Sequence, residues 1–584
     1  MMLRIAGNAG TGAAASRRRT DILALAVVLA AAALLWLPRF SGPIDLRWDG
    51  AVYYILGTSL AEGRGYKLLN EPGEIDAVQY PPLLPAIVAA CQVALGTSDP
   101  VVVGRWLRLS SFLVFLVFAG ASFRFLRDYL PAQQAAPGAL ISVMCVHAWF
   151  LSDMLFPEVW FTAASLLFLI LARRDGATSQ APAYICAVAA CALRTIGLAA
   201  LAAWVLDSAL RRRFGQAAVR AALAAVPVLF WQGYLASVER SEAYRRPAYA
   251  YQRAPYLFYN VSYARNIALR DPFTPEKGDV QILRRVARNA LALPVHVGGT
   301  LSVSRGYGEL ALHTLFGDGR IIRPLIVWST FAVLYAFGAV VLAGGAVVLW
   351  RQRHHLVLSY VALYLAALCM TPFPQQNLRY LMPITPMLAL FAIALLNAVA
   401  ERRTEADRSA KEKRLLSVAP WIVIALQVAV VAAVHVREYR PAAYEMHNGV
   451  TINQRLFYYD DAQEGFDRAV DYVDAHADRD DVVAAGVPHW IHLRTGLKTV
   501  MPPFEADAAS AQTLLDSVPV DYLLVGSDVI ASERYTVPVV RQCSEAWELV
   551  FTSRVGGWKV YRRTERTPPP SCGTRRTPPQ SRPR

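Results

Sequence analysis

The chain has 584 residues, of which 55% are apolar and 18% are charged, and its mean hydropathy is +0.31. This composition excludes a soluble protein of that length and indicates a membrane protein with many spans. The net charge of +15 is dispersed over loops and chain ends, which favours attraction to anionic lipid headgroups or a lipid phosphate and argues against nucleic-acid binding.

Apolar stretches near the length of about 20 residues that crosses a bilayer recur along the chain. Residues 183–206 carry Arg194 and Gly197 in their middle, so they form either one span or two short helices. The total is therefore about ten or eleven spans. The apolar stretches cover residues 21–38, 105–123, 136–152, 157–172, 183–206, 217–235, 322–349, 356–372, 380–399 and 418–436.

Basic residues in short loops predict which ends of the spans face the cytoplasm. Residues 1–20 contain "SRRR", and the other basic loops are 124–128, 172–176, 210–215, 350–355 and 401–414. All six lie on one side only if residues 82–96 do not cross, so we interpret that run as an amphipathic helix at the outer surface. The first loop 39–104, the long segment 236–321 and everything after about 437 are then extracytoplasmic. This topology predicts a bacterial inner (plasma) membrane protein whose spans occupy 21–436.

Residues 437–563 have the composition of a soluble domain. Phe466, Val470 and Val473 have helical spacing, whereas "DVVAAG", "VDYLLVG", "WELVFTS" and "WKVYRR" are short β-rich runs,. We predict a small extracytoplasmic α/β domain here. The basic, Pro-rich tail 564–584 is predicted to be disordered.

Cysteine and histidine spacing does not predict a metal site. His489 and His492 in "PHWIH" lack the HExxH pattern, so we expect them in the core or on the surface,. Cys543 and Cys572 are the two cysteines outside apolar runs. Because an extracytoplasmic compartment permits oxidation, we predict that they pair.

The first loop supplies the first candidate for chemistry. Asp49 lies in "RWDGAVYYILGTSLAEGRGY" (47–66) with no basic residue three or four positions later, so its carboxylate is available as a general base,. The alternative is an N-cap for the helix that follows. Tyr53 and Tyr54 could stack on a sugar or anchor the chain at the membrane interface.

Two further acids lie at or just before the start of the span 157–172. Glu158 follows Pro157, a combination that starts a helix and complements its dipole, and Asp153 lies five residues earlier,. Since a carboxylate near hydrocarbon costs free energy unless it is paired or wet, an acid here also suggests the mouth of a functional cavity.

Arginines among apolar residues are the third signal. On insertion scales a mid-helix arginine costs about 2.5–3.5 kcal/mol, so Arg194 in "CALRTIGL" needs a partner. That partner is either an acid on another helix or a lipid-linked phosphate, which a guanidinium binds as a fork. Arg379 and Tyr380 in "QNLRYLMPITP" begin a span from outside and admit the same two readings.

These motifs together resemble those of the GT-C membrane glycosyltransferases. "DGAVYYILGTSLAEGRGY…YPPLLP", "LFPEVWFTAASLLFLILAR", "LRTIGL" and "RYLMPITP" follow one another in the order of the family that includes the protein O-mannosyltransferases and the lipid A aminoarabinose transferase. The resemblance covers residues 45 to about 400. It implies a sugar donor linked to polyprenyl phosphate, inversion at the anomeric carbon, and an acceptor deprotonated on the outer face.

The resemblance also implies roles for single residues. Asp49 matches the acid of the first loop and Glu158 the second acid. Tyr80 precedes the Pro pair where some relatives carry Lys, so it offers a substrate contact without the positive charge. Gly50 follows Asp49, where many mannosyl-transferring relatives carry a second acid, which weakens any transfer of their substrates to this chain.

The sequence therefore predicts a glycosyltransferase with a lipid, glycan or protein acceptor. Asp49 would take the acceptor proton, and Arg194 or Arg379 would stabilise charge on the departing phosphate. This scheme requires no cofactor, although Glu158 could hold a divalent cation. The alternative is a multi-pass transporter or flippase of lipid-linked sugars without transferase activity.

Overall fold

A computed structural model of the chain describes residues 6–174, 176–304, 306–310, 323–402, 410–447, 449–526 and 532–564. It divides into two compact units. The first unit comprises Met1–Tyr53, Tyr80–Tyr234 and Gln281–Arg440, and the second comprises Tyr54–Gln79, Leu235–Val280 and Pro441–Arg584.

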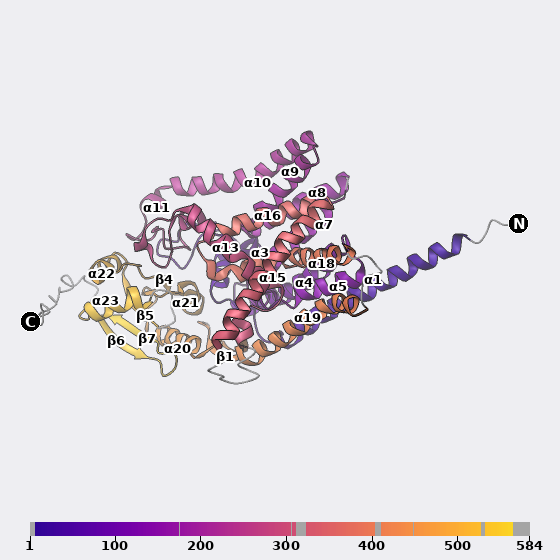
Figure 1. The fold of residues 1–584 in the computed structure, drawn as a ribbon. Helices are drawn as coiled ribbons and strands as arrows, with labels where there is room; N and C mark the ends of the chain where they lie inside the picture. Colours follow the sequence, from indigo (N-terminus) through magenta and orange to yellow (C-terminus); the bar gives the residue numbers. More distant parts are fainter. Residues whose placement is uncertain are drawn as a thin grey trace, which may run out of the picture. The chain divides into compact units, whose positions relative to one another are not determined.

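The first unit is a helical membrane domain (Figure 1). In the described part of the chain, 6 helices are long and apolar enough to cross a membrane. Each predicted apolar stretch falls on one or more helices, and the described part of this unit also contains helices outside those stretches, at Leu83–Leu95 and Ile282–Leu301. The longer ones are α1 (Ala6–Trp36), α4 (Pro100–Arg127), α10 (Phe214–Arg240), α15 (Arg323–Arg351), α18 (Thr385–Arg402) and α19 (Ala410–Glu438), and the shorter ones are α3 (Leu83–Leu95), α5 (Ala132–Val143), α6 (Val146–Leu151), α7 (Glu158–Ala172), α8 (Ala177–Leu193), α9 (Leu198–Leu210), α13 (Ile282–Leu301), α16 (His355–Cys369) and α17 (Asn377–Leu381).

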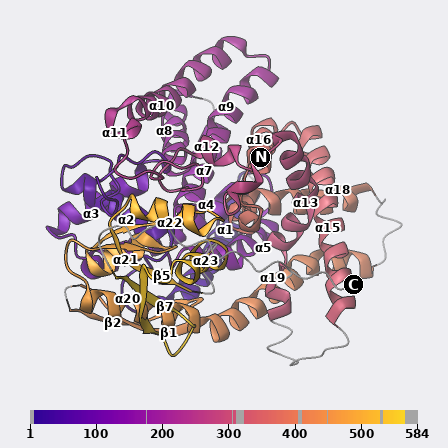
Figure 2. The same ribbon diagram turned by 90° about the vertical axis from the view of Figure 1, so that its left-hand side faces the viewer.

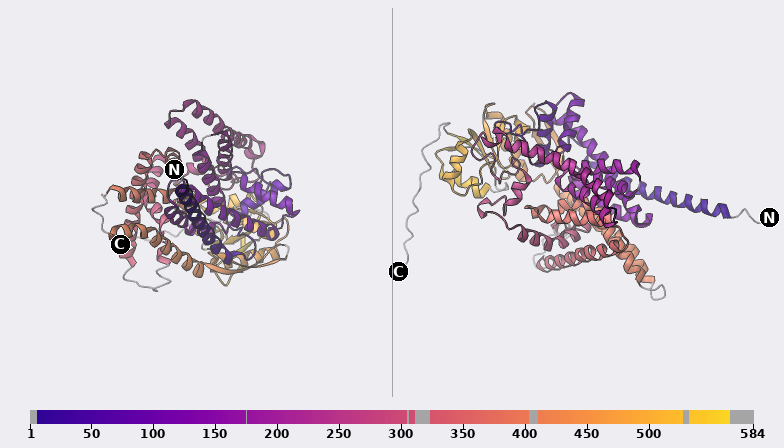
Figure 3. Two further views of the ribbon diagram at one scale, coloured as in Figure 1. Left: turned by 90° about the vertical axis from the view of Figure 1, so that its right-hand side faces the viewer. Right: turned by 90° about the horizontal axis from the view of Figure 1, so that it is seen from above.

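Helices at the edge of the first unit show how it meets lipid. Helix α10 lies beside α9 (Figures 1 and 2), and Arg220 of α10 donates to the Trp204 carbonyl and to Ser208 Oγ. Most of its apolar side chains, such as Leu229 and Phe230, remain exposed. The start of α1 extends beyond the other helices of this unit (Figure 3). Exposed apolar faces of this kind are what a hydrocarbon environment covers.

Glycines allow helices α13 and α15 to pack at backbone distance. A Cβ on Gly338 would lie 1.9 Å from the Pro294 carbonyl oxygen, and one on Gly298 would lie 2.2 Å from the Leu334 carbonyl oxygen. Small residues at such a crossing are the usual means by which membrane helices approach closely.

The stretch 183–206 forms two helices and not one. Helix α8 ends at Leu193, Arg194 has extended backbone angles (φ −148°, ψ 136°), and a 3-10 turn at Thr195–Gly197 leads into α9. A Cβ on Gly197 would lie 2.5 Å from the Ala190 carbonyl oxygen, so the turn folds tightly onto the last turn of α8. The predicted topology needs an even number of crossings here to keep the basic loops 172–176 and 210–215 on the same side, and two helices are compatible with it,.

The second unit is built on a five-stranded sheet of order β4-β3-β5-β7-β6. Strand β3 pairs in parallel with β4 and β5, whereas β7 pairs antiparallel with β5 and β6. The predicted sheet domain is confirmed, although the short β4 was not predicted. The elements are β3 (Val482–Ala484), β4 (Lys498–Val500), β5 (Val520–Val525), β6 (Trp547–Thr552), β7 (Lys559–Arg563), α20 (Asp461–His476), α21 (Pro488–Thr495), α22 (Ala508–Asp516) and α23 (Val537–Gln542), and a separate two-stranded sheet joins β1 (Tyr439–Glu445) and β2 (Thr451–Phe457).

Part of the first loop is folded into this second unit at the edge of its sheet. The Thr499 amide donates to the Asn70 carbonyl (2.7 Å), and Asn70 Nδ2 donates back to the Thr499 carbonyl (3.2 Å). Lys498 Nζ donates to the Leu69 carbonyl (2.7 Å) and to Glu74 Oε1 (2.8 Å). The loop therefore packs against β4 at the edge of the sheet.

A buried carboxylate fastens the same loop to the segment 235–280. Glu71 accepts hydrogen bonds from the Tyr249 hydroxyl (2.8 Å), from Gln252 Nε2 (3.2 Å) and from Asn260 Nδ2 (3.0 Å). Three stretches far apart in sequence thus form one body. A single folded body lies on one side of a bilayer, so the three stretches share one side, as the predicted topology requires.

Cysteine and histidine residues of the second unit behave as structural groups. Cys543 is disulfide-bonded, as the predicted pairing requires, whereas Cys572 and the tail from residue 565 onward lie outside the described residues. The five cysteines in apolar runs are free thiols. His489 is buried against the Tyr259 ring, and His492 Nδ1 contacts the Leu497 carbonyl at 2.7 Å.

Candidate functional site

A parallel β-bridge brings the two candidate acids together. The Asp45 amide donates to the Asp153 carbonyl (3.1 Å), and the Leu155 amide donates to the Asp45 carbonyl (3.0 Å), which pairs Asp45 with Met154. Asp49 lies four residues after one bridge partner, and Glu158 lies four residues after the other. Asp49 is the first residue of α2 (Asp49–Ala61) and Glu158 is the first residue of α7. Both acids therefore stand at helix N-termini, where the dipole favours negative charge.

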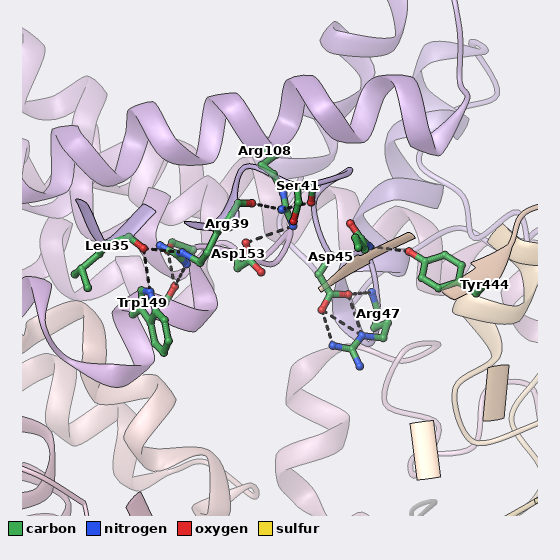
Figure 4. Close-up of polar contacts among 11 residues, drawn as sticks. Leu35, Arg39, Ser41, Asp45, Arg47, Arg108, Trp149, Asp153 and Tyr444 are labelled. Carbon is green, nitrogen blue, oxygen red and sulfur yellow. Dashed lines mark hydrogen bonds and ion pairs between the residues drawn. The ribbon is translucent and has the colours of Figure 1, made fainter. Parts of the chain in front are cut away.

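A buried cluster of charged side chains surrounds Asp153, whose carbonyl takes part in this bridge (Figure 4). Arg108 Nη2 lies 3.3 Å from Asp153 Oδ1, and Arg108 Nη1 donates to the carbonyls of Arg39 and Ser41. Arg39 Nη1 donates to the Trp149 carbonyl at 2.5 Å. Asp153, predicted to bind substrate, thus lies in a fully buried structural cluster.

Arg379 connects the two acids directly. Its Nη2 donates to Asp49 Oδ2 at 3.0 Å, and its Nε donates to Glu158 Oε1 at 2.5 Å. The guanidinium carbon also lies 4.2 Å from the centre of the Phe156 ring. One planar cation therefore bridges two helix N-termini and rests on an aromatic face, an arrangement that suits arginine and not lysine.

Arg194 approaches the same carboxylate from the break between α8 and α9. Its Nη1 donates to Glu158 Oε1, and its guanidinium carbon lies 5.0 Å from the centre of the Tyr380 ring. Tyr380 is fixed in turn, because its carbonyl accepts a hydrogen bond from the Tyr364 hydroxyl at 2.6 Å. The partner that the sequence required for Arg194 is therefore an acid on another helix.

Tyr80 occupies the remaining oxygen of Asp49. Its hydroxyl donates to Asp49 Oδ1 at 3.1 Å, and its ring meets the Tyr53 ring edge-on with centroids 4.9 Å apart. Burial and the nearby Asp49 carboxylate raise the pKa of Tyr53 well above its ordinary value, so this phenol stays neutral. Tyr54 is buried on α2 one residue later.

The site is a network of two carboxylates and two guanidiniums, three of which are partly exposed. The Glu158 side chain is 0% exposed and its Oε2 is buried without a hydrogen-bond partner, whereas the side chains of Arg379, Asp49 and Arg194 are 15%, 20% and 21% exposed. A ligand can therefore reach Asp49 and both arginines without reaching Glu158.

The structure brings together most of the residues singled out from the sequence, namely Asp49, Tyr53, Tyr80, Glu158, Arg194, Arg379 and Tyr380. It adds Phe156, which sequence reasoning missed. An aromatic residue directly before Pro157 and Glu158 is common at membrane interfaces, so it carried no separate signal. Only the contact with Arg379 distinguishes it.

Comparisons with known proteins address the fold. No protein-family model and no curated protein sequence matches the chain. The archaeal oligosaccharyltransferase AglB from Archaeoglobus fulgidus, solved in complex with an inhibitory peptide and a dolichol-phosphate, matches with a TM-score of 0.51 and 11% identity over 94% of this chain and 75% of that chain. The chain has the GT-C fold.

A second solved structure of this fold is also similar. ArnT from Cupriavidus metallidurans, bound to undecaprenyl phosphate, has a TM-score of 0.47 and 12% identity over 92% of this chain and 97% of that chain. The AglB match confirms the resemblance found in the motifs at the level of the GT-C fold, and it covers more of the chain than the motifs do.

Proposed function

We propose that the chain is a membrane glycosyltransferase that moves a sugar from a polyprenyl-phosphate donor to a hydroxyl acceptor on the extracytoplasmic face. The observation that carries this proposal is the network of Asp49, Arg379, Glu158 and Arg194 at neighbouring helix ends of a GT-C fold. The complex of AglB with a dolichol-phosphate supports the donor class, since the two proteins share this fold.

The two arginines are proposed to bind the donor phosphate. Each guanidinium is partly exposed and has N–H groups beyond those given to the acids, and guanidiniums bind phosphate as a two-pronged fork,. Their side chains enter from separate segments, the α8–α9 break and α17. A phosphate placed between them would lie next to Asp49, the carboxylate that Arg379 already touches.

The reaction needs one proton transfer and one substitution. Asp49 removes the proton of the acceptor hydroxyl while that oxygen forms a bond to the anomeric carbon of the sugar. The bond between this carbon and the phosphate oxygen breaks, its electron pair stays on the phosphate, and polyprenyl phosphate leaves. Attack on the face opposite the leaving group inverts the anomeric carbon. Arg194 and Arg379 stabilise the charge that develops on the phosphate.

Glu158 is proposed to position the arginines and not to act as a base. It is fully buried and already accepts hydrogen bonds from both guanidiniums. Within the residues that the structure describes, no group of three or more His, Cys, Asp or Glu side chains could hold a metal ion.

The test is transfer from a panel of polyprenyl-phosphate sugars by membranes that contain the protein. The release of polyprenyl phosphate is followed for the wild type, for Asp49→Asn and for Glu62→Gln. Glu62 is an exposed acid on the same loop and serves as the matched control. Loss of release in Asp49→Asn alone, at equal membrane insertion, supports the enzyme. Absence of release from every donor in the panel by the wild type would favour the transporter interpretation.

A further inference from the structure

The contacts of Asp49 pose a chemical problem for a general base. Its Oδ1 accepts a hydrogen bond from Tyr80, and its Oδ2 accepts one from Arg379. An ion pair with arginine stabilises the charged form of a carboxylate and so weakens it as a proton acceptor. Each oxygen thus accepts one hydrogen bond in the free protein, and an acceptor hydroxyl has to donate to a carboxylate that is still paired with Arg379.

We infer that Arg379 is a latch on Asp49 that the donor phosphate releases. In the free protein, the guanidinium holds Asp49 Oδ2 and keeps the base inactive. When a phosphate binds, Arg379 turns toward it and leaves this oxygen free for the acceptor proton. Arg379 is therefore a positioning residue for the base as well as a phosphate ligand. This inference rests on the proposed function and adds an order of events to it.

The two contacts of Arg379 differ in how easily they can be exchanged. Glu158 is 0% exposed and has Arg379 and Arg194 as its cationic partners, so removing Arg379 from it would leave a buried charge less well compensated,. Asp49 is 20% exposed and keeps its hydrogen bond from Tyr80. A phosphate that competes for the guanidinium should therefore displace Asp49 and not Glu158. Glu158 then acts as the pivot on which Arg379 turns.

The charge balance of the site also favours displacement of Asp49 from Arg379. The free site has two carboxylates for two guanidiniums, and a donor phosphodiester adds one further negative charge. The guanidiniums cannot lose protons to adjust. Asp49 is also the carboxylate that takes the acceptor proton. As transfer proceeds, the negative charge that Asp49 loses appears on the departing phosphate, where both arginines can stabilise it.

The latch would make the base available only when the donor is in place. An acceptor that arrives first would meet a carboxylate still held by its ion pair with Arg379. Tyr80 would hold Oδ1 throughout and so fix the direction of the released Oδ2, which explains a tyrosine at a position where a lysine would compete with Arg379 for Asp49.

The inference is tested by a structure of the full chain in nanodiscs with undecaprenyl phosphate. Undecaprenol, which has the same tail without the phosphate, is the matched control. We expect the phosphate to lie between Arg194 and Arg379. The distance from the Arg379 guanidinium to the Asp49 carboxylate should exceed the hydrogen-bond limit of about 3.5 Å, whereas the pair between Arg379 and Glu158 should stay intact. Undecaprenol should leave the Arg379 to Asp49 contact in place.

The other outcomes separate the latch from the proposed function. Phosphate bound at the arginines with the Arg379 to Asp49 contact intact would overturn the latch and leave the transferase proposal standing. Loss of that contact with undecaprenol as well would also overturn the latch, because the phosphate would not be its cause. Phosphate bound away from both arginines would overturn the latch together with the proposed donor site.

Discussion

Asp45 and Met154 pair as a parallel β-bridge, and each precedes one of the two candidate acids by four residues. The relative position of Asp49 and Glu158 is therefore set by backbone hydrogen bonds and by two helix starts. Side-chain contacts with Arg379 then connect groups that the backbone has already placed side by side.

Gly50 offers a test of how sensitive the site is to this backbone geometry. A Cβ at Gly50 would lie 3.3 Å from the Asp45 carbonyl oxygen and 3.6 Å from Leu155 Cβ, so Gly50→Ala should move the start of α2 by a few tenths of an ångström. Since a displacement of 1 Å can cost about 10²-fold in rate, we expect turnover to fall by up to about tenfold. Gly215→Ala, on α10 with nothing within 4 Å, is the control and should leave turnover unchanged. Equal turnover of both variants would show that the bridge tolerates the shift.

The predicted topology can be tested with reporter fusions. Basic loops place residues 1–20, 124–135, 173–181, 211–216, 351–355 and 401–417 in the cytoplasm. A reporter fused after residue 98 should be active only as an extracytoplasmic reporter, and so should one fused after Ile196, because two helices meet at Arg194. A cytoplasmic signal after residue 98 would mean that 82–96 crosses the membrane, which contradicts the scheme.

Glu71 should make the stability of the second unit depend on pH. Burial raises its pKa above the ordinary value of 4.5, against the lowering effect of hydrogen bonds from Tyr249, Asn260 and Gln252. The folded protein thus holds this proton more tightly than the unfolded chain. Its contribution to stability is fully present below the unfolded pKa and is lost as pH rises through the folded pKa.

The Glu71→Gln variant isolates that contribution, because glutamine does not titrate. We expect the difference in melting temperature, wild type minus Glu71→Gln, to decrease as pH rises from about 4 toward neutrality. Thermal melting of both proteins over this range measures it. A difference that stays constant, or that grows with pH, would contradict the assigned direction.

Much of the fold could be predicted because hydropathy and charge are local signals. The apolar stretches, the short helix at 82–96 and the sheet domain each follow from runs of a few residues or more,. The break at Arg194 could not be decided, since apolar residues on both sides fit one span or two helices equally well. What decides it is the close approach of Gly197 to Ala190, a tertiary contact.

The members of the site could be predicted more fully than its connections. Asp49, Glu158, Arg194 and Arg379 are conspicuous because charged residues among apolar ones need a reason. The pairing of Asp45 with Met154 across more than a hundred residues has no sequence periodicity, so the proximity of the acids came from the structure. For the same reason the sequence could not separate Asp153 from Glu158.

Glu158 should matter for stability as well as for catalysis. Glu158→Gln removes a buried charge that both arginines share, and breaking a buried pair costs about 3–5 kcal/mol, with the lower end expected because the arginines are partly exposed,. Glu242→Gln, which breaks an exposed pair with Arg246, is the control and should change stability by less than about 1 kcal/mol,. Chemical or thermal unfolding in detergent measures both. Equal stability of the two variants would mean that Glu158 is not a structural anchor for the arginines.

The sharpest prediction concerns the division of labour between Asp49 and Arg194. General-base catalysis typically contributes about 10²–10⁴-fold, so Asp49→Asn should lower turnover by that order. Donor affinity should not fall, and the latch predicts that it rises, because the phosphate no longer competes with the Asp49 carboxylate for Arg379. Arg194→Ala should weaken donor binding as well as turnover, because its guanidinium would hold the phosphate in both the ground state and the transition state. Turnover and donor affinity of both variants in nanodiscs, with folding checked by thermal melting, measure the difference. If Asp49→Asn retains wild-type turnover, or loses donor binding as severely as Arg194→Ala, the two roles are assigned wrongly.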